Sequence, residues 1–167
     1  MYNYRLATPD DLETLLRMGE QFHKEHIEPG LPIPYDYDSA ALAAFDMMEN
    51  GLLVVATVDP EGTVHGDEAF GTGPVIGMLG ISSFPYRFNQ RYKIAKEEMF
   101  WIDPEHRGQK LSAELIAVTG IGAGADDADY SAMVALESSP AHVGGLYKAL
   151  GYRPFETTYI RKIKQED

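Results

Sequence analysis

KEEMFWIDPEHRGQKLSAELI, residues 96–116, reads as a strand, a tight turn and the beginning of a helix. The apolar run at residues 99–102 predicts the strand, which Asp103 and Pro104 bring to an end. Apolar positions at helical spacing begin at Leu111. We therefore expect the chain to pass from a sheet into a helix through a short loop.

The loop before that helix has the properties of an anion-binding site. The first backbone N–H groups of a helix have no partner within the helix, and they lie at the positive end of its dipole. Arg107 adds a permanent cation, and Gly108 lets a ligand approach the backbone without a side chain in the way. The sequence therefore predicts that this loop binds a phosphate group.

A second motif, GLYKALGY, follows at residues 145–152. Together with WIDPEHRG at residues 101–108, it resembles the GNAT N-acetyltransferase family, in which a cofactor loop and a helix ending in Leu-Tyr-x-x-x-Gly-Phe/Tyr occur in this order and at this spacing. The family's loop pattern is Gln/Arg-x-x-Gly-x-Gly/Ala. This chain departs from it at Glu105 and at Lys110.

The resemblance implies a mixed α/β (α+β) fold, with a single acyl-CoA N-acyltransferase domain over residues 1–167. Its central sheet would be mostly antiparallel, splayed and flanked by helices. The resemblance also implies acetyl-CoA as cosubstrate, with the pantetheine arm pairing with the central strand where the next strand parts from it, and it implies no metal. The implied cofactor-binding residues are Trp101, Ile102, Arg107, Gly108, Gln109, Lys110, Leu111 and Ser112.

Aminolysis of a thioester needs a base that takes a proton from the amine and an acid that protonates the departing thiolate. The resemblance implies Tyr147 as the acid, a role that suits a phenol because it is protonated near pH 7. It implies Glu98 as the base. Strand alternation sends only one of Glu97 and Glu98 to a given face, and places Glu98 on the side of Phe100 and Ile102. Three alternatives for the base therefore stay open: Glu98, Glu97 or neither of them.

The bulk composition narrows the class of protein. The 167 residues, 44% of them hydrophobic, suit one globular domain. No window approaches the roughly 20 apolar residues of a membrane span, and the N-terminus does not resemble a signal peptide, so we expect a cytoplasmic protein without a membrane partner. The absence of cysteine removes disulfides and thiolate nucleophiles. The net charge of -12 disfavours nucleic acid as a partner and favours a cationic acceptor, although an acidic balance also serves solubility alone.

The remaining elements are predicted from apolar periodicity, caps and turn residues. We expect further strands at residues 2–7, 52–58, 75–81 and 133–136, and closing strands within residues 152–163. We expect helices from the Thr8 cap to near His26, from an Asp38 or Ser39 cap to Asn50, and from a cap at Ser138 or Ser139, with Pro140 in the first turn, to Leu150. Residues 82–95, where aromatic and polar side chains mix, are expected to form a loop. Its aromatic side chains either pack under that loop, or some of them lie around the acceptor.

Three other patterns are weaker. His23 and His26 have a spacing that can hold a metal, but no third ligand is implied. GIGAG at residues 120–124 resembles part of a dinucleotide fingerprint, yet it follows a helix instead of a strand. No G-x-S-x-G nucleophile elbow occurs.

These observations lead to one hypothesis, that the chain is an acyltransferase that moves an acetyl group from acetyl-CoA to a primary amine by direct attack. The acceptor would be a small molecule or a peptide, and its identity cannot be read from the residues. The alternative is a catalytically degenerate member that binds acyl-CoA or acts as a regulatory module, which Glu105 and Lys110 keep open. Homodimers are frequent in the family.

Overall fold

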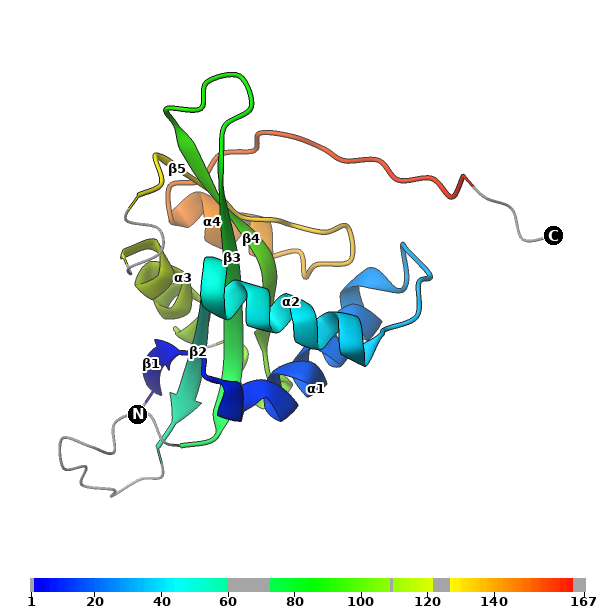
Figure 1. Ribbon diagram of the computed structural model, residues 1–167, viewed down its shortest axis with the longest axis vertical. Coiled ribbons are helices and arrows are strands. Elements are labelled where there is room, and N and C mark those ends of the chain that lie inside the picture. Colours follow the sequence, from blue (N-terminus) through cyan, green and yellow to red (C-terminus); the bar gives the residue numbers. More distant parts are fainter. Residues whose placement is uncertain (1, 60–72, 109, 122–126, 164–167) are drawn as a thin grey trace.

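The computed structural model, which describes residues 2–59, 73–108, 110–121 and 127–163, is built on one open sheet (Figure 1). The sheet has five strands in the order in which they occur along the chain, and neighbours are antiparallel except for the last pair, which is parallel. The strands are β1 (Tyr2–Leu6), β2 (Leu52–Val58), β3 (Val75–Pro85), β4 (Lys93–Ile102) and β5 (Tyr130–Ala132). The predicted mixed α/β fold with a mostly antiparallel sheet is confirmed.

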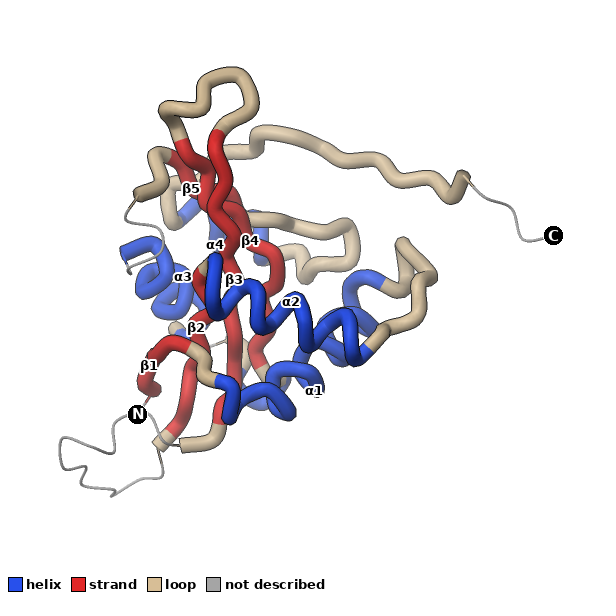
Figure 2. Tube along the Cα trace, in the orientation of Figure 1, coloured by secondary structure: helices blue, strands red, loops and turns tan. Residues whose placement is uncertain are grey.

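Helices cover both faces of the sheet (Figure 1 and Figure 2). Two of them, α1 (Leu12–Phe22) and α2 (Tyr37–Asn50), pack on one face, which we call the α1–α2 face. The opposite, α3–α4 face carries α3 (Leu111–Ile121) and α4 (Val143–Ala149). Among the described residues, no helix has the length and apolar character needed to cross a membrane.

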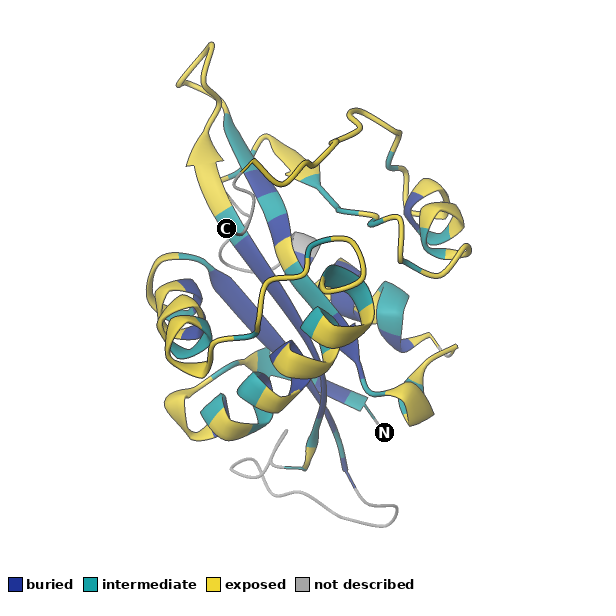
Figure 3. Ribbon diagram, turned by 90° about the vertical axis from the view of Figure 1, so that its right-hand side faces the viewer, coloured by how far each residue is buried: buried dark blue, intermediate teal, exposed yellow. Residues whose placement is uncertain are grey.

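Strand β2 is buried on both faces, which explains why all of its residues except Thr57 are apolar. Leu53 and Val55 contact the α1–α2 face, whereas Leu52, Val54 and Ala56 belong to the core on the other face. Alternate side chains of a strand point to opposite sides, so a central strand between two helical layers is apolar along most of its length. Figure 3 shows the buried strands running between exposed helical surfaces.

The first helix and the second helix differ from the sequence prediction at their ends. A short 3-10 turn at Pro9–Asp11 precedes α1, and the last turn, His23–Ile27, widens to a π-helix before the loop. The second helix begins earlier than expected, because Asp36 is its cap: the Asp36 carboxylate accepts a hydrogen bond from the Ser39 N–H at 2.8 Å. Its predicted end at Asn50 is confirmed.

The prediction of a loop over residues 82–95 is wrong. Strands β3 and β4 pair as far as Pro85 and Lys93, which leaves only residues 86–92 as the connection. This end of the hairpin projects beyond the helical layers (Figure 1), and its aromatic residues, such as Phe84, are exposed. The segment therefore lacks the apolar alternation by which a half-buried strand is recognised.

The last part of the chain also departs from the prediction. The strand expected at residues 133–136 lies earlier, at β5, and it has only three residues. The Ser139 hydroxyl accepts a hydrogen bond from the Leu136 N–H at 3.0 Å in a turn, and it does not cap a helix there; α4 begins later. Residues 152–163, which are all described, form no strand in the structure, so the prediction of closing strands there is wrong.

Candidate functional site

The sheet opens where β4 and β5 part. Their pairing is limited to Ile94, Ala95 and Lys96 on the β4 side, whereas β4 continues to Ile102. We call the side of residues 97–102 that faces away from β3 the open β4 edge. Its backbone N–H and C=O groups have no neighbouring strand in the described structure. Such groups need partners, and an extended ligand can pair with them as another strand would.

A buried carboxyl and a phenol lie at the point where the strands part. Glu97 Oε2 accepts hydrogen bonds from the Tyr147 hydroxyl at 3.1 Å and from the Val134 N–H at 3.0 Å. Only 6% of Glu97 and 7% of Tyr147 are exposed. Burial raises the pKa of Glu97 to about 7, although both hydrogen bonds act in the opposite direction. This carboxyl can therefore hold or release a proton near neutral pH.

The pKa of Tyr147 is raised far above its usual value. Burial is the largest cause, and the negative charge of Glu97 adds to it. The phenol therefore stays protonated at any physiological pH. Tyr147 is positioned by the short helix α4 and packs into the α3–α4 core beside Tyr152, with ring centroids 6.0 Å apart. A protonated hydroxyl is thus fixed next to a carboxyl that titrates near neutrality.

A β-bulge separates Glu98 from Glu97. In the ladder between β3 and β4, Gly80 pairs with Met99 and Ile81 pairs with Glu97, so Glu98 is the extra residue on β4. A bulge interrupts alternation and re-aims the side chains beyond it. Glu98 lines a pocket on the α1–α2 face together with Met99.

The expected position of Glu98 on the side of Phe100 and Ile102 is therefore wrong. Both of those side chains pack on the α3–α4 face. Glu98 is exposed, and it accepts a hydrogen bond from the Ser82 hydroxyl across the hairpin. The two adjacent glutamates thus differ in surroundings, one buried beside Tyr147 and the other open to water.

A loop connects β4 to α3, as predicted, and it contains a 3-10 turn at Pro104–His106 that the sequence analysis did not predict. Gly108 has a φ of +78°, in the left-handed region that favours glycine. The Lys110 carbonyl accepts the N–H of Glu114 at 3.0 Å, so the helix starts directly after Lys110. The N–H groups of its first turn, from Leu111 and Ser112 onward, point back toward the loop without helical partners. Gln109 lies outside the described residues.

The sequence predicts Arg107 as a cation available to an anion. In the structure its side chain has partners within the protein instead. Its Nε donates to the Ile102 carbonyl at 2.9 Å, and its guanidinium lies 4.4 Å from the Trp101 ring centroid. The same guanidinium is 3.3 Å from the Glu25 carboxylate in the π-helical turn after α1. Arg107 therefore ties the loop to the end of β4 and to α1.

Ile102 turns its backbone groups toward the open β4 edge and Trp101 turns its own toward β3, because the Asp103 N–H donates to the Ile76 carbonyl and adjacent residues of an antiparallel strand alternate between the two edges. Trp101 is 2% exposed on the α1–α2 face, and its Nε1 donates to Asp103 at 3.0 Å. Ile102 is buried in the core on the opposite face. Asp103 also pairs with Arg17 of α1 at 3.1 Å. The end of β4 is thus fixed on both sides.

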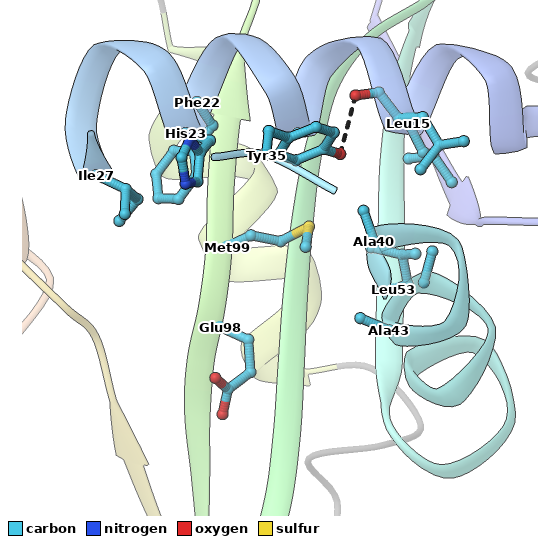
Figure 4. A pocket seen from close by; sticks show the side chains of 13 residues that line it. Leu15, Phe22, His23, Ile27, Tyr35, Ala40, Ala43, Leu53, Glu98 and Met99 are labelled. Atoms are coloured by element: carbon cyan, nitrogen blue, oxygen red, sulfur yellow. Dashed lines mark hydrogen bonds between the residues drawn. The ribbon is translucent and has the colours of Figure 1, made fainter. Parts of the chain in front are cut away.

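The pocket lined by Glu98 lies between α1, α2 and the sheet (Figure 4). Leu15, Phe22, Ile27 and Leu53 are among its apolar walls. Tyr35 crosses under α1 and donates to the Leu16 carbonyl at 3.1 Å. Sequence analysis did not identify this pocket, since its walls come from segments far apart in the chain.

The two histidines of the π-helical turn after α1 have different surroundings. The His23 ring packs edge-on against Tyr35, with centroids 5.6 Å apart. The His26 ring lies 5.6 Å from Phe22 and 6.1 Å from Trp101. No group of three or more metal-ligating side chains gathers within the described part of the chain. These imidazoles act here as aromatic packing partners.

Comparison with known proteins places these features in a family. A model described as "Acetyltransferase (GNAT) family" matches residues 17–152. No curated protein matches the chain.

Solved structures share the fold at low sequence identity. The ribosomal-protein-alanine N-acetyltransferase from Brucella melitensis biovar Abortus 2308 has a TM-score of 0.67 and 14% identity, over 98% of this chain and 100% of that one. A protein described as a "predicted acetyltransferase with acetyl-CoA" from Clostridium acetobutylicum has a TM-score of 0.66 and 16% identity, over 98% of this chain and 97% of that one. The aminoglycoside N-acetyltransferase AAC(6')-Iy in complex with CoA has a TM-score of 0.67 and 15% identity, over 98% and 96%.

Proposed function

The chain belongs to the GNAT acetyltransferase family, and we propose that it transfers an acetyl group from acetyl-CoA to a primary amine. The observation that carries this proposal is the parting of β4 from β5, with the Glu97–Tyr147 pair at the fork. An open strand edge beside a protonated phenol suits a thioester that must be held in line and whose sulfur must be protonated. Two structural neighbours were solved with acetyl-CoA or CoA, which supports the same choice of donor.

Acetyl-CoA would bind as an extra strand. Its pantetheine amides would pair with backbone groups on the open β4 edge. Of the two residues expected to contact the arm, Ile102 turns its N–H and C=O to that edge, where its carbonyl would exchange the Arg107 Nε for the ligand, and Trp101 would contribute as its neighbour on the strand. Its diphosphate would accept hydrogen bonds from the N–H groups at the start of α3, at Leu111 and Ser112. Gly108 gives the close approach that this requires, because its backbone is left-handed and the space that a Cβ would face is open, with no atom within 4 Å.

The charged and polar residues of the loop would complete that site. Lys110 is exposed and supplies a positive charge beside the diphosphate. Gln109 belongs to the same site by its place in the sequence. Arg107 would act on the coenzyme chiefly through the loop, because its guanidinium contacts Trp101 and Glu25.

In the reaction, the amine nitrogen attacks the thioester carbonyl carbon and the carbon–sulfur bond breaks. Tyr147 donates its hydroxyl proton to the departing thiolate. Glu97, whose pKa is about 7, hydrogen-bonds to that hydroxyl and can return a proton to it. Glu98, on the other side of β4 and open to water, accepts a proton from the acceptor ammonium and passes it to solvent. After the attack, the second proton of the nitrogen leaves by the same route, and solvent returns a proton to Glu97. The products are an acetylated amine and coenzyme A with a free thiol.

The cellular location and the oligomeric state of the enzyme belong to the same proposal. A chain without cysteine needs no oxidising compartment, which is consistent with the cytoplasm. A homodimer remains a prediction, and light scattering of the purified protein would test it.

The direct experiment is thiol release from acetyl-CoA in the presence of an amine, comparing Tyr147→Phe with the wild type. We expect kcat to fall about 100-fold, because a positioned general acid typically contributes that much, while the KM for acetyl-CoA changes little. Tyr152→Phe is the matched control, since the Tyr152 hydroxyl contacts Ser131 and its ring lies beside that of Tyr147. An unchanged kcat in Tyr147→Phe would remove this residue from the mechanism. Coenzyme binding without turnover of any amine would favour a binding module instead.

A further inference from the structure

The pocket on the α1–α2 face is apolar at one end and negative at the other. Figure 4 shows Glu98 at the end away from α1, Phe22, His23 and Tyr35 under α1, and Met99 between them. The walls are side chains of leucine, isoleucine, phenylalanine, methionine and alanine. Glu98 is the one acidic residue among the thirteen that line the pocket, and none of the thirteen is lysine or arginine.

Few polar atoms in the pocket are available to a ligand. The Tyr35 hydroxyl already donates to the Leu16 carbonyl, and burial raises the pKa of Tyr35 to about 12. The His23 ring packs against Tyr35. A second charge on a ligand placed beneath α1 would therefore lose its hydration, and none of the residues that line that end of the pocket carries a permanent charge; the carboxylate of Glu20 acts on Tyr35 from outside the lining.

The pocket and the open β4 edge share the same stretch of β4. Glu98 and Met99 line the pocket, and the residues after them form the edge to which the thioester would bind. The β-bulge at Glu98 makes this possible, because it turns Met99 toward the α1–α2 face. An amine seated at Glu98 thus lies on the strand that would hold the thioester.

We propose that the acceptor is a small primary amine with a compact, uncharged apolar group. The ammonium pairs with Glu98 before it loses its proton, and the apolar group lies on Met99 beneath α1, between Phe22 and Leu53. This inference rests on the proposed acetyl transfer and names its acceptor class. It disfavours polyamines, which carry a second ammonium, and free amino acids, whose carboxylate would face Glu98 in a pocket lined by no lysine or arginine.

Two matched pairs of amines test the acceptor class. Pentylamine and 1,5-diaminopentane have the same chain length and differ in one ammonium at the far end. 2-Phenylethylamine and phenylalanine differ in one carboxylate next to the amine. With saturating acetyl-CoA and thiol release as the readout, we expect kcat/KM to be at least roughly tenfold higher for the first member of each pair, because an unpaired charge is costly to desolvate. Mass spectrometry identifies the acetylated product.

A substitution that makes the pocket smaller gives a second test of the acceptor class. Ala43 lines the pocket on α2, and it is exposed, so Ala43→Leu should fold while reducing the room for the apolar group. We expect the KM for 2-phenylethylamine to rise roughly tenfold, on the scale of a displaced apolar contact, with the KM for acetyl-CoA unchanged. Ala41→Leu, on the same helix but outside the lining, is the matched control and should keep both constants.

The possible results distinguish failure of the proposed acceptor class from failure of the proposed acetyl transfer. Equal or faster turnover of 1,5-diaminopentane and phenylalanine would overturn the acceptor class and leave acetyl transfer standing. Failure to acetylate all four amines, when calorimetry shows that acetyl-CoA binds, would also overturn the acceptor class. Failure to bind acetyl-CoA at all would overturn the proposed function itself, and the acceptor class with it.

Discussion

Replacing Glu97 by glutamine removes one titrating group from the interior and keeps its shape. Both hydrogen bonds in the structure end on the same oxygen, Oε2, to which Tyr147 and the Val134 N–H donate. The amide oxygen of glutamine can accept both of them. The two proteins therefore differ chiefly in whether this buried position can carry a negative charge.

The size of the effect follows from the pKa of Glu97, which burial raises from an ordinary 4.5 to about 7. Between those values the unfolded chain has released the proton and the folded chain still holds it, so stability falls as pH rises through this window. The stabilising contribution is fully present below the lower value and is lost above the upper one. Because one pKa unit corresponds to about 1.4 kcal/mol, the total loss is about 3 kcal/mol.

Urea unfolding of wild type and Glu97→Gln at pH 4.5 and at pH 8 measures this directly. Other groups also titrate in this range, but they are common to both proteins and cancel in the difference. We expect Glu97→Gln to gain about 3 kcal/mol over the wild type between the two pH values. Glu98→Gln removes the same charge from the exposed neighbour and should not reproduce the gain.

If the free energy of unfolding changed with pH by the same amount in wild type and in Glu97→Gln, that result would refute the reasoning. It would mean that Glu97 ionises in the folded protein as readily as in the unfolded chain. The role of Glu97 as a proton partner of Tyr147 near neutral pH would then have no physical basis.

Three substitutions in the loop before α3 test the coenzyme site. Arg107→Ala should raise the Kd for acetyl-CoA and lower the Tm, since it releases the loop from Trp101; equal calorimetric affinities would contradict this. Gly108→Ala should cost about 1 kcal/mol in urea unfolding, because its φ of +78° is unfavourable for a side chain, and an unaltered midpoint would argue against that conformation. Lys110→Ala should weaken acetyl-CoA binding more at low salt than at high salt, and a salt-independent loss would exclude a charge contact.

The parts of the fold that could be predicted have local causes. The β-branched run of β2, the Asn50–Gly51 helix end and the strand–loop–helix around Gly108 each carry their own signal in neighbouring residues. Such signals do not depend on the rest of the molecule. The family motifs added the overall architecture, which the strand order confirms.

The parts that could not be predicted depend on long-range contacts. The residues around Glu98 give no sequence signal for the β-bulge, which is identified only from the pairing of β4 with β3. The guanidinium of Arg107 is turned away from the loop by Glu25, which is distant in sequence. The burial that raises the pKa of Glu97 arises from β4 packing against α4 and the chain after β5. Periodicity cannot report contacts of these kinds.

The structure of the protein with acetyl-CoA bound would test the central claim most directly. We predict that the pantetheine arm lies along the open β4 edge, with its sulfur near Tyr147 and its diphosphate at the N–H groups of Leu111 and Ser112. Coenzyme bound elsewhere, or crystals that stay free of coenzyme at saturating concentration, would contradict the account.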